Sequence, residues 1–185
     1  MIAVRRLDSV ATPSRWRVLL LGLAAAFGLS AMARADATTA VGPAALPDVD
    51  HVRVLKSQRR MTLFSQGRPV HAIEGLQFGD EPIGPKRFEG DERTPEGRYT
   101  IDYGNPDSAY HLSLHISYPD PGNLAYAAAR GRSAGGMIFI HGQPNAWPSG
   151  RVPGDWTDGC IAVSNAEIEL LWNAVLDGAT IDILP

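Results

Sequence analysis

The sequence predicts a mainly β domain of the α+β class, with one or two helices, over residues 51–185. Short apolar runs separated by glycine, proline and small polar residues indicate several short strands. Apolar and polar residues alternate from His111 to Ile116, as expected of a strand with one buried face. An amphipathic segment after Ser164 has the capping pattern of a helix. Together these patterns predict one compact domain with a single core.

Residues 1–35 have the pattern of a secretory signal peptide. A basic leader precedes the apolar stretch Val18–Leu29, and Ala33-Arg34-Ala35 offers small residues where a signal peptidase cleaves, here before Asp36. The stretch is shorter than the ~20 apolar residues that a spanning helix needs, so no stable membrane span is expected after cleavage. These residues predict export to the periplasm.

Residues 36–50 predict a short flexible tether. They are rich in small residues and proline and show no hydrophobic periodicity. The folded domain is therefore expected to begin at His51.

The first half of the domain consists of short predicted strands. They are expected at 52–55, 61–64, 70–76, 97–103 and 110–116. Ser57-Gln58-Arg59 and Gln66-Gly67 supply the first two turns. Between Phe78 and Gly97 lies a long polar loop, and loops of this length in compact domains are often functional.

The second half contains the predicted helices. A short helix is expected at 123–130, where Gly131 stops it, and buried strands are expected at 137–140 and 161–163. The clearest helix begins after Ser164, because Ser164 can cap its free N–H groups while Glu167 reaches back.

The apolar face of that helix is expected to pack on the core. It comprises Ile168, Leu171, Trp172 and Val175. Asp177-Gly178 is expected to end the helix, and a last strand follows at 180–184.

The overall charge excludes some classes of partner. A formal net charge of -3 gives no whole-chain attraction to nucleic acid or to anionic lipid. One cysteine and scattered histidines match no zinc-ligand spacing, so neither a metal nor a cofactor is expected.

Cys160 is the most informative residue of the chain. It is the only cysteine, so in an oxidising compartment it cannot close an intrachain disulfide. It follows Gly159 in the run Thr157-Asp158-Gly159-Cys160, and His141 ends an apolar run upstream. A cysteine and a histidine are the parts of a thiol nucleophile with its base. The alternative is an inert thiol in the core, the commoner role of a free cysteine.

These residues resemble a known family. Ile140-His141-Gly142, followed by Thr157-Asp158-Gly159-Cys160-Ile161, is similar to the signature of the L,D-transpeptidase catalytic domain, the YkuD-like family. The nineteen-residue step from His141 to Cys160 lies within the family's pattern, and residues 84–97 resemble its segment before the central strand. The resemblance implies a β-sandwich-like catalytic domain that remodels peptidoglycan stem peptides in the periplasm.

The chemistry assigns roles to the motif residues. Cys160 would attack as a thiolate, and His141 would take its proton and return it to the leaving amine. Gly159 would permit close approach of the substrate, and the N–H groups of Gly159 and Cys160 are the expected oxyanion donors. By resemblance, the donor is a tetrapeptide stem attacked at the carbonyl of its third residue.

Two departures from the family pattern affect the site. Asp158 stands where many members have histidine or lysine, and Ala162 stands where many have a substrate-binding arginine. Asp158 either points away from the thiol or orients His141 as the third member of a triad. Thr157 and Gly142 are the remaining candidates for orienting or cleft roles.

Other side chains are candidates for binding the substrate. Arg151, Arg132 and Arg93 could replace the missing arginine, although each is more often a solvated surface charge. Trp147 and Trp156, in the loop between His141 and Cys160, would wall the cleft or pack the loop.

Three functions stay open from the sequence. The first is an L,D-transpeptidase, and the second is a hydrolase of the same fold, an L,D-carboxypeptidase or an amidase that releases wall-attached lipoprotein. The motif around Cys160 resembles a murein-amidase-like branch of the family. The third is a non-catalytic peptidoglycan-binding module, which an inert thiol would favour. A catalytic Cys160 is expected to react quickly with alkylating agents near neutral pH.

Overall fold

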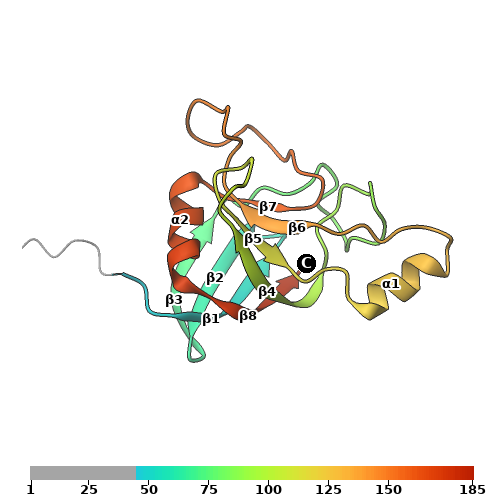
Figure 1. Cartoon of the computed structure of the whole chain (residues 1–185), viewed down its shortest axis with the longest axis horizontal. Coiled ribbons are helices and arrows are strands. Elements are labelled where there is room, and N and C mark those ends of the chain that lie inside the picture. The colour runs from blue at the N-terminus through green and yellow to red at the C-terminus, as the bar shows by residue number, and fades with distance from the viewer. Residues whose placement is uncertain (1–44) are drawn as a thin grey trace, which may run out of the picture. The chain divides into compact units, whose positions relative to one another are not determined.

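The computed structural model describes residues 45–185, and one eight-stranded sheet with two helices dominates them (Figure 1). This confirms the predicted mainly β class. The predicted signal peptide and residues 36–44 of the tether lie outside the described residues. The strands are β1 (Val49–Leu55), β2 (Arg60–Ser65), β3 (Arg68–Glu74), β4 (Gly97–Asn105), β5 (Ser113–Ile116), β6 (Ile138–His141), β7 (Ile161–Ala162) and β8 (Val175–Leu184). The helices are α1 (Pro121–Ala128) and α2 (Asn165–Ala174).

The sheet curls until its two ends meet. Its strand order is β3-β2-β1-β8-β4-β5-β6-β7, with parallel pairs at β1/β8 and β6/β7 and antiparallel pairs elsewhere. Gln77 follows β3 at one end of this order and pairs with Ala162 of β7 at the other, through backbone hydrogen bonds of 3.1 and 2.9 Å. The short strand β7 is therefore hydrogen-bonded on both sides.

The core lies inside the curl and follows the period of the strands. Val52 and Val54 of β1 are fully buried, as are Ile181 and Ile183 of β8, while Arg53 between the valines is exposed. Alternate residues of a strand point to opposite faces, so one face of each strand supplies the core. In α2, Ile168 and Leu171 are fully buried against it.

No helix among residues 45–185 has both the length and the apolar character needed to cross a membrane.

The first and last strands are longer than predicted because they pair with each other. β1 begins at Val49, inside the segment predicted as tether, since Val49 is fully buried and pairs with Val175. The predicted continuation of α2 to Asp177-Gly178 is wrong for the same reason. Val175 leaves the helical conformation at φ -80° and ψ 124° and begins β8 directly.

Other boundaries shift where the backbone turns. β5 covers only Ser113–Ile116, because His111 has a φ of 71° and cannot continue a strand. β3 runs from Arg68 to Glu74 rather than to Leu76, and Gly75 with φ 69° ends it.

Both helices begin with a capping box. Ser164 caps α2 as predicted: its Oγ accepts from the Glu167 N–H at 3.3 Å, and the Glu167 carboxylate accepts from the Ser164 N–H at 2.7 Å. α1 begins at Pro121, two residues before the prediction, because Asp120 caps it and proline suits the first helical turn.

The Ser164 cap directly follows β7 and so contributes to the position of Cys160. We expect Ser164→Ala to lower the free energy of unfolding by about 1 kcal/mol, because the Glu167 N–H at the start of α2 loses its hydrogen-bond partner. Urea denaturation measures this change. Asn173→Ala, on the exposed face of α2, is the matched control and should leave stability within about 0.5 kcal/mol. Equal effects of the two substitutions would contradict the capping role.

Candidate active site

The parallel pairing of β6 with β7 brings the two predicted reactive residues together. His141 ends β6 opposite Ala162, and the Phe139 N–H donates to the Cys160 sulfur at 3.4 Å. Parallel neighbours need a long crossover connection, which explains why His141 and Cys160 are far apart in sequence yet adjacent in the sheet. The crossover here is the loop from Gly142 to Gly159, with no helix or strand.

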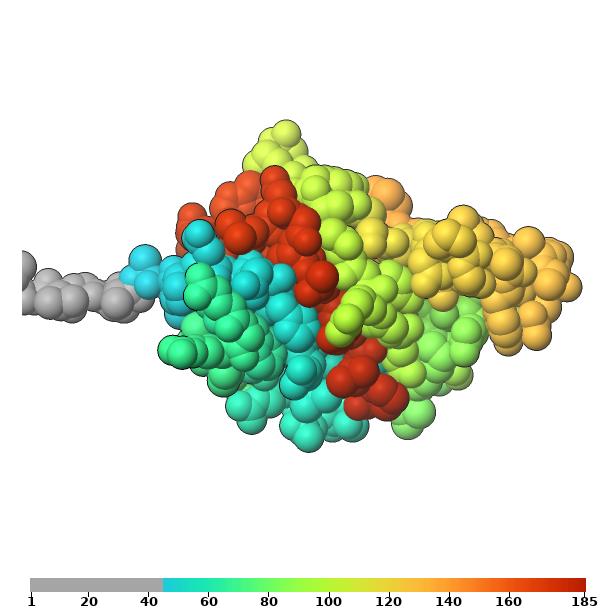
Figure 2. Space-filling view, turned by 90° about the horizontal axis from the view of Figure 1, so that it is seen from below, coloured from blue at the N-terminus to red at the C-terminus, as the bar shows by residue number. Residues whose placement is uncertain are grey.

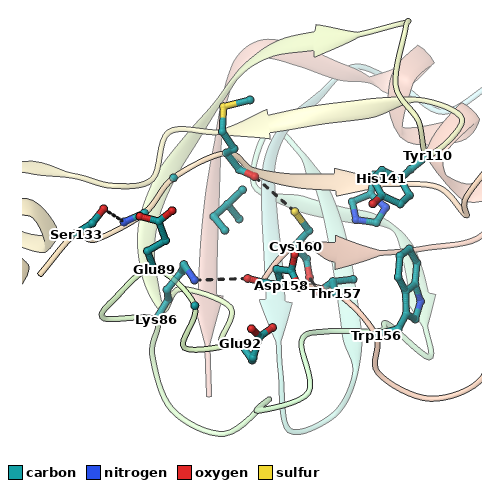
Figure 3. Close-up of a pocket in the computed structure, with 15 residues that line it drawn as sticks. Lys86, Glu89, Glu92, Tyr110, Ser133, His141, Trp156, Thr157, Asp158 and Cys160 are labelled. Carbon is teal, nitrogen blue, oxygen red and sulfur yellow. Dashed lines mark hydrogen bonds between the residues drawn. The ribbon is translucent and has the colours of Figure 1, made fainter.

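Cys160 lies in the wall of a pocket of about 770 Å³. Figure 3 shows charged side chains on one side of the thiol and His141 with two aromatic rings on the other. The lining residues are Lys86, Glu89, Gly90, Glu92, Tyr110, Ser133, Gly135, Gly136, Met137, Ile138, His141, Trp156, Thr157, Asp158 and Cys160. No group of three or more histidine, cysteine or acidic side chains among residues 45–185 is arranged to hold a metal ion.

The His141 imidazole is held as a neutral base. Its Nδ1 lies 2.7 Å from the Gly142 carbonyl oxygen. A carbonyl only accepts, so Nδ1 carries the proton and Nε2 is left with its lone pair. Burial lowers the pKa of His141 below its ordinary value, and the hydrogen bond to Gly142 opposes that shift only in part. The rings of Tyr110 and Trp156 pack on the imidazole at centroid distances of 4.6 and 5.5 Å.

Gly142, and not Asp158, orients the histidine. A side chain at Gly142 would collide with the Asn165 side chain and with the Tyr110 carbonyl, so only glycine allows this turn. Asp158 is exposed and lies beside Glu92, whose pKa is raised by desolvation and by the Asp158 carboxylate. Asp158 is therefore not the partner of His141, and it does not point clear of the thiol either, since it lines the same pocket and its charge raises the pKa of Cys160.

The Cys160 thiol is protonated at neutral pH in this structure. Burial raises its pKa to about 11, and the charge of Asp158 acts in the same direction. The hydrogen bond from Phe139 and the charge of Lys86 oppose the shift without cancelling it. The sulfur donates to the Met137 carbonyl at 3.6 Å. A neutral thiol thus faces the same pocket as a neutral imidazole.

The turn before Cys160 is fixed by Thr157 and Gly159. The Thr157 hydroxyl donates to the Cys160 carbonyl at 2.8 Å and accepts from the Gly159 N–H at 3.2 Å. The Gly159 N–H is therefore already used, which corrects its assignment as an oxyanion donor. Among the described residues, the Cys160 N–H has no hydrogen-bond partner and stays a candidate donor.

Gly159 is needed for packing within the protein, and its predicted role in the approach of the substrate stays a prediction. Its φ is 124°, and a Cβ there would collide with the Arg93 carbonyl oxygen. The backbone that comes close at this glycine is thus the protein's own, in the polar loop before β4.

Two buried glutamines secure the loop between His141 and Cys160. The Gln77 amide donates to the carbonyls of Val152 and Gly154. The Gln143 amide donates to Gln77 Oε1 at 3.2 Å, and its oxygen accepts from the Val152 N–H at 2.8 Å. Neither glutamine was predicted as a site residue, although a glutamine between Leu76 and Phe78 in an apolar run was a signal.

An ion pair fixes the segment just before the thiol. Arg59 donates two hydrogen bonds of 2.6 Å to Asp155, which also accepts from the Phe78 N–H at 2.9 Å. Burial alone would raise the pKa of Asp155, but the hydrogen bonds from Arg59 and Phe78 hold it below its ordinary value. The Phe78 carbonyl in turn accepts from the N–H groups of Trp156 and Thr157 at 3.0 Å.

None of the three predicted arginines lines the pocket. Arg151 donates hydrogen bonds to the Gly75 carbonyl and the Glu167 carboxylate, and the second of these attaches the crossover loop to α2. Arg93 lies 4.0 Å from Glu81, and Arg132 stacks on Phe88.

Lys86 is the one cation among the residues that line the pocket, and the sequence analysis did not assign it a role. Its side chain is only 3% exposed and pairs with Asp91 at 3.0 Å, with a further contact to the Asp158 carbonyl. Of the two tryptophans, Trp156 lines the pocket and Trp147 does not.

Comparison with known proteins identifies one family. Residues 49–183 match the family model of the L,D-transpeptidase catalytic domain, YkuD. The chain is 25% identical over 130 residues to the protein named "Putative L,D-transpeptidase YafK" of Escherichia coli K12, covering 68% of this chain and 46% of YafK.

Two solved structures are similar in fold. The helical cell shape determining protein Pgp2 from Campylobacter jejuni has a TM-score of 0.58 at 28% identity, over 74% of this chain and 48% of Pgp2. Bd1075 of Bdellovibrio bacteriovorus has a TM-score of 0.52 at 23% identity, over 77% of this chain and 53% of Bd1075. The chain spans about half the length of these relatives.

The conformation of Gly159 predicts a large cost of substitution. We expect Gly159→Ala to destabilise the fold by about 3 kcal/mol, from its positive φ together with the collision at Arg93. Gly154→Ala is the matched control, since Gly154 has φ 75° but open space around its Cα, and it should cost only about 1–2 kcal/mol. Thermal unfolding measures the stability of the two variants against that of the native protein. Equal losses of stability in both would show that the Arg93 contact is unimportant.

The raised thiol pKa predicts slow alkylation near neutral pH, contrary to the expectation from sequence. Because the folded protein keeps the thiol protonated, the rate with iodoacetamide should rise about tenfold per pH unit from pH 7 to 10, without a plateau below about pH 11. Cys160→Ala controls for labelling elsewhere, and free cysteine, with its lower pKa, should level off earlier. A plateau for the protein near pH 7 would contradict the assignment of a protonated thiol.

Proposed function

The chain belongs to the L,D-transpeptidase catalytic domain family, and from this premise we propose that it is a periplasmic cysteine-dependent L,D-transpeptidase acting on peptidoglycan stem peptides. One observation carries the proposal: Cys160 and a neutral His141 line one pocket, and the Gly142 carbonyl leaves His141 Nε2 without a proton. The similarity to Pgp2, a helical cell shape determining protein, supports a substrate in the cell wall.

The geometry supports a mechanism in which the thiolate forms only during attack. His141 Nε2 takes the thiol proton as the Cys160 sulfur bonds to the carbonyl carbon of the third stem residue. The resulting oxyanion accepts a hydrogen bond from the free Cys160 N–H. When the intermediate collapses, the C–N bond breaks, and the imidazolium returns its proton to the departing D-alanine amine. A thioester to Cys160 remains.

The second half of the reaction decides the class of enzyme. For a transpeptidase, an amine of a neighbouring stem attacks the thioester, loses its proton to His141 and releases Cys160. For a hydrolase, water takes the place of the amine, and the product is a shortened stem or a released lipoprotein. An acceptor amine must be bound and oriented, whereas water needs no such site.

Hydrolysis is the second candidate because of the environment of Ala162. An alanine has no guanidinium to offer the pocket, and this residue is fully buried between His141 and Gln77. A donor stem can still enter the pocket, but one family device for binding substrate is missing. We place transpeptidation first, on the premise of the family.

Incubation of the pure protein with disaccharide tetrapeptide, followed by mass analysis, tests the proposal. We expect Cys160→Ala to abolish turnover with the fold intact, and His141→Ala to lower turnover about 10²–10⁴-fold.

Because burial lowers the pKa of His141, the acid limb of kcat/KM should lie below pH 6.5, where protonation of Nε2 removes the base.

The products separate the alternatives. Cross-linked dimers identify a transpeptidase, and tripeptide alone or released lipoprotein identifies a hydrolase. Unchanged turnover in Cys160→Ala would overturn the mechanism. No turnover by the wild type, with the muropeptide still bound, would leave a peptidoglycan-binding module.

A further inference from the structure

A projecting arm stands beside the candidate active site. It comprises residues 120–137, which contain α1 and the segment that returns to β6, and it forms one end of the described surface in Figure 2. The buried Tyr118 hydroxyl donates to the Ala134 carbonyl at 2.9 Å, and the Glu89 N–H donates to the Ser133 carbonyl at 2.9 Å. Gly135 packs so closely on Glu89 that a Cβ would lie 3.2 Å from its Cα. The arm is thus fixed to the polar loop before β4.

Three arginines gather where the arm meets this loop, and we call them the arginine cluster. Arg87 and Arg130 both lie over the Tyr126 ring, at 4.7 and 3.6 Å from its centroid, and Arg132 lies over Phe88 at 3.8 Å. The two rings pack at 5.9 Å. Stacking holds each planar guanidinium while its N–H edges can still donate to an oxyanion.

The arginine cluster has no acidic partner among the described residues. All three side chains are exposed. None of the ion pairs among the described residues includes Arg87, Arg130 or Arg132. Elsewhere among the described residues, arginines such as Arg59 and Arg98 are paired with carboxylates, whereas Arg53 and Arg68 stand singly without an ion pair. The chain as a whole is acidic, with a formal net charge of -3, so three unpaired cations together form a local exception.

Chain neighbours of the cluster line the pocket that contains Cys160. Ser133 follows Arg132 directly and lines the pocket, as does Glu89, which follows Phe88. A peptide that leaves the pocket on this side therefore meets the arginine cluster.

The charge of the pocket lining indicates which groups of a ligand the arginine cluster would bind. The lining carries the carboxylates of Glu89, Glu92 and Asp158, and its one cation, Lys86, is paired with Asp91. An anionic group is disfavoured beside these carboxylates and favoured at the cluster. Resting on the proposed function, we propose that the arginine cluster binds side carboxylates of the stem peptide, which positions the chain whose carbonyl Cys160 attacks.

Direct binding tests this proposal without requiring turnover. In full-length Cys160→Ala protein, the Kd of a disaccharide tetrapeptide is measured before and after the triple change Arg87→Gln, Arg130→Gln and Arg132→Gln. We expect the Kd to rise about tenfold, roughly a factor of two for each exposed guanidinium. Arg53→Gln is the matched control, because Arg53 also lies over a ring, Phe64, at 5.0 Å but on β1, and it should leave the Kd unchanged.

A second ligand makes the test independent of folding of the triple variant. The same muropeptide with its carboxylates amidated should bind the Cys160→Ala protein about tenfold more weakly, and its Kd should lose most of its salt dependence. In otherwise native enzyme, the triple change should raise KM by a larger factor than it lowers kcat.

The outcomes separate this proposal from the proposed function. Equal Kd values for free and amidated muropeptide, or for Cys160→Ala protein with and without the triple change, would overturn the carboxylate site whether or not the native enzyme turns over. Loss of binding to phosphatidylglycerol vesicles with an unchanged muropeptide Kd would also overturn it and assign the cluster to lipid. Absence of turnover with the expected change in Kd would refute the proposed function and leave the site standing.

Discussion

Parallel pairing of β6 with β7 is the interaction on which the candidate site depends. β7 has only two residues, and its backbone is bonded to β6 on one side and to Gln77 on the other. This double pairing closes the curled sheet and sets His141 and Cys160 at neighbouring positions. A two-residue strand has little stability alone, so the loop that leads into it must be held by other means. Gln77, Gln143 and the Arg59–Asp155 pair provide those contacts.

The chemistry of the pair follows from this burial. His141 is buried and Cys160 is partly shielded from water, which disfavours the charged form of each: the pKa of the thiol rises and that of the imidazole falls. A thiolate–imidazolium pair is thus not the resting state of this structure. The Gly142 carbonyl still selects the tautomer, so the base is ready before any substrate arrives.

Charge is distributed unevenly around the thiol. Carboxylates line one side of the pocket and aromatic rings the other, while the unpaired arginine cluster stands where the arm meets the loop before β4. Ala162, at the position where the family resemblance predicted an arginine, is buried. In the proposed carboxylate site, cationic recognition therefore lies on the arginine cluster and not on the strand after the cysteine.

The sequence by itself determined the elements whose signals are local. The strand period identified the sheet, Ser164 and Glu167 predicted the start of α2, and the glycine–cysteine motif with an upstream histidine predicted the reactive pair. Each of these signals lies within a few neighbouring residues, where sterics and hydrogen bonding act directly.

Only the tertiary structure decided the rest. Val175 leaves α2 because Val49 pairs with it across the sheet, and the Gly159 N–H is taken by Thr157 while its Cα packs on Arg93. The gathering of Arg87 with Arg130 likewise depends on the arm folding against a distant loop. Burial and partners between residues far apart in the chain set these outcomes, and no local pattern encodes which remote group will arrive.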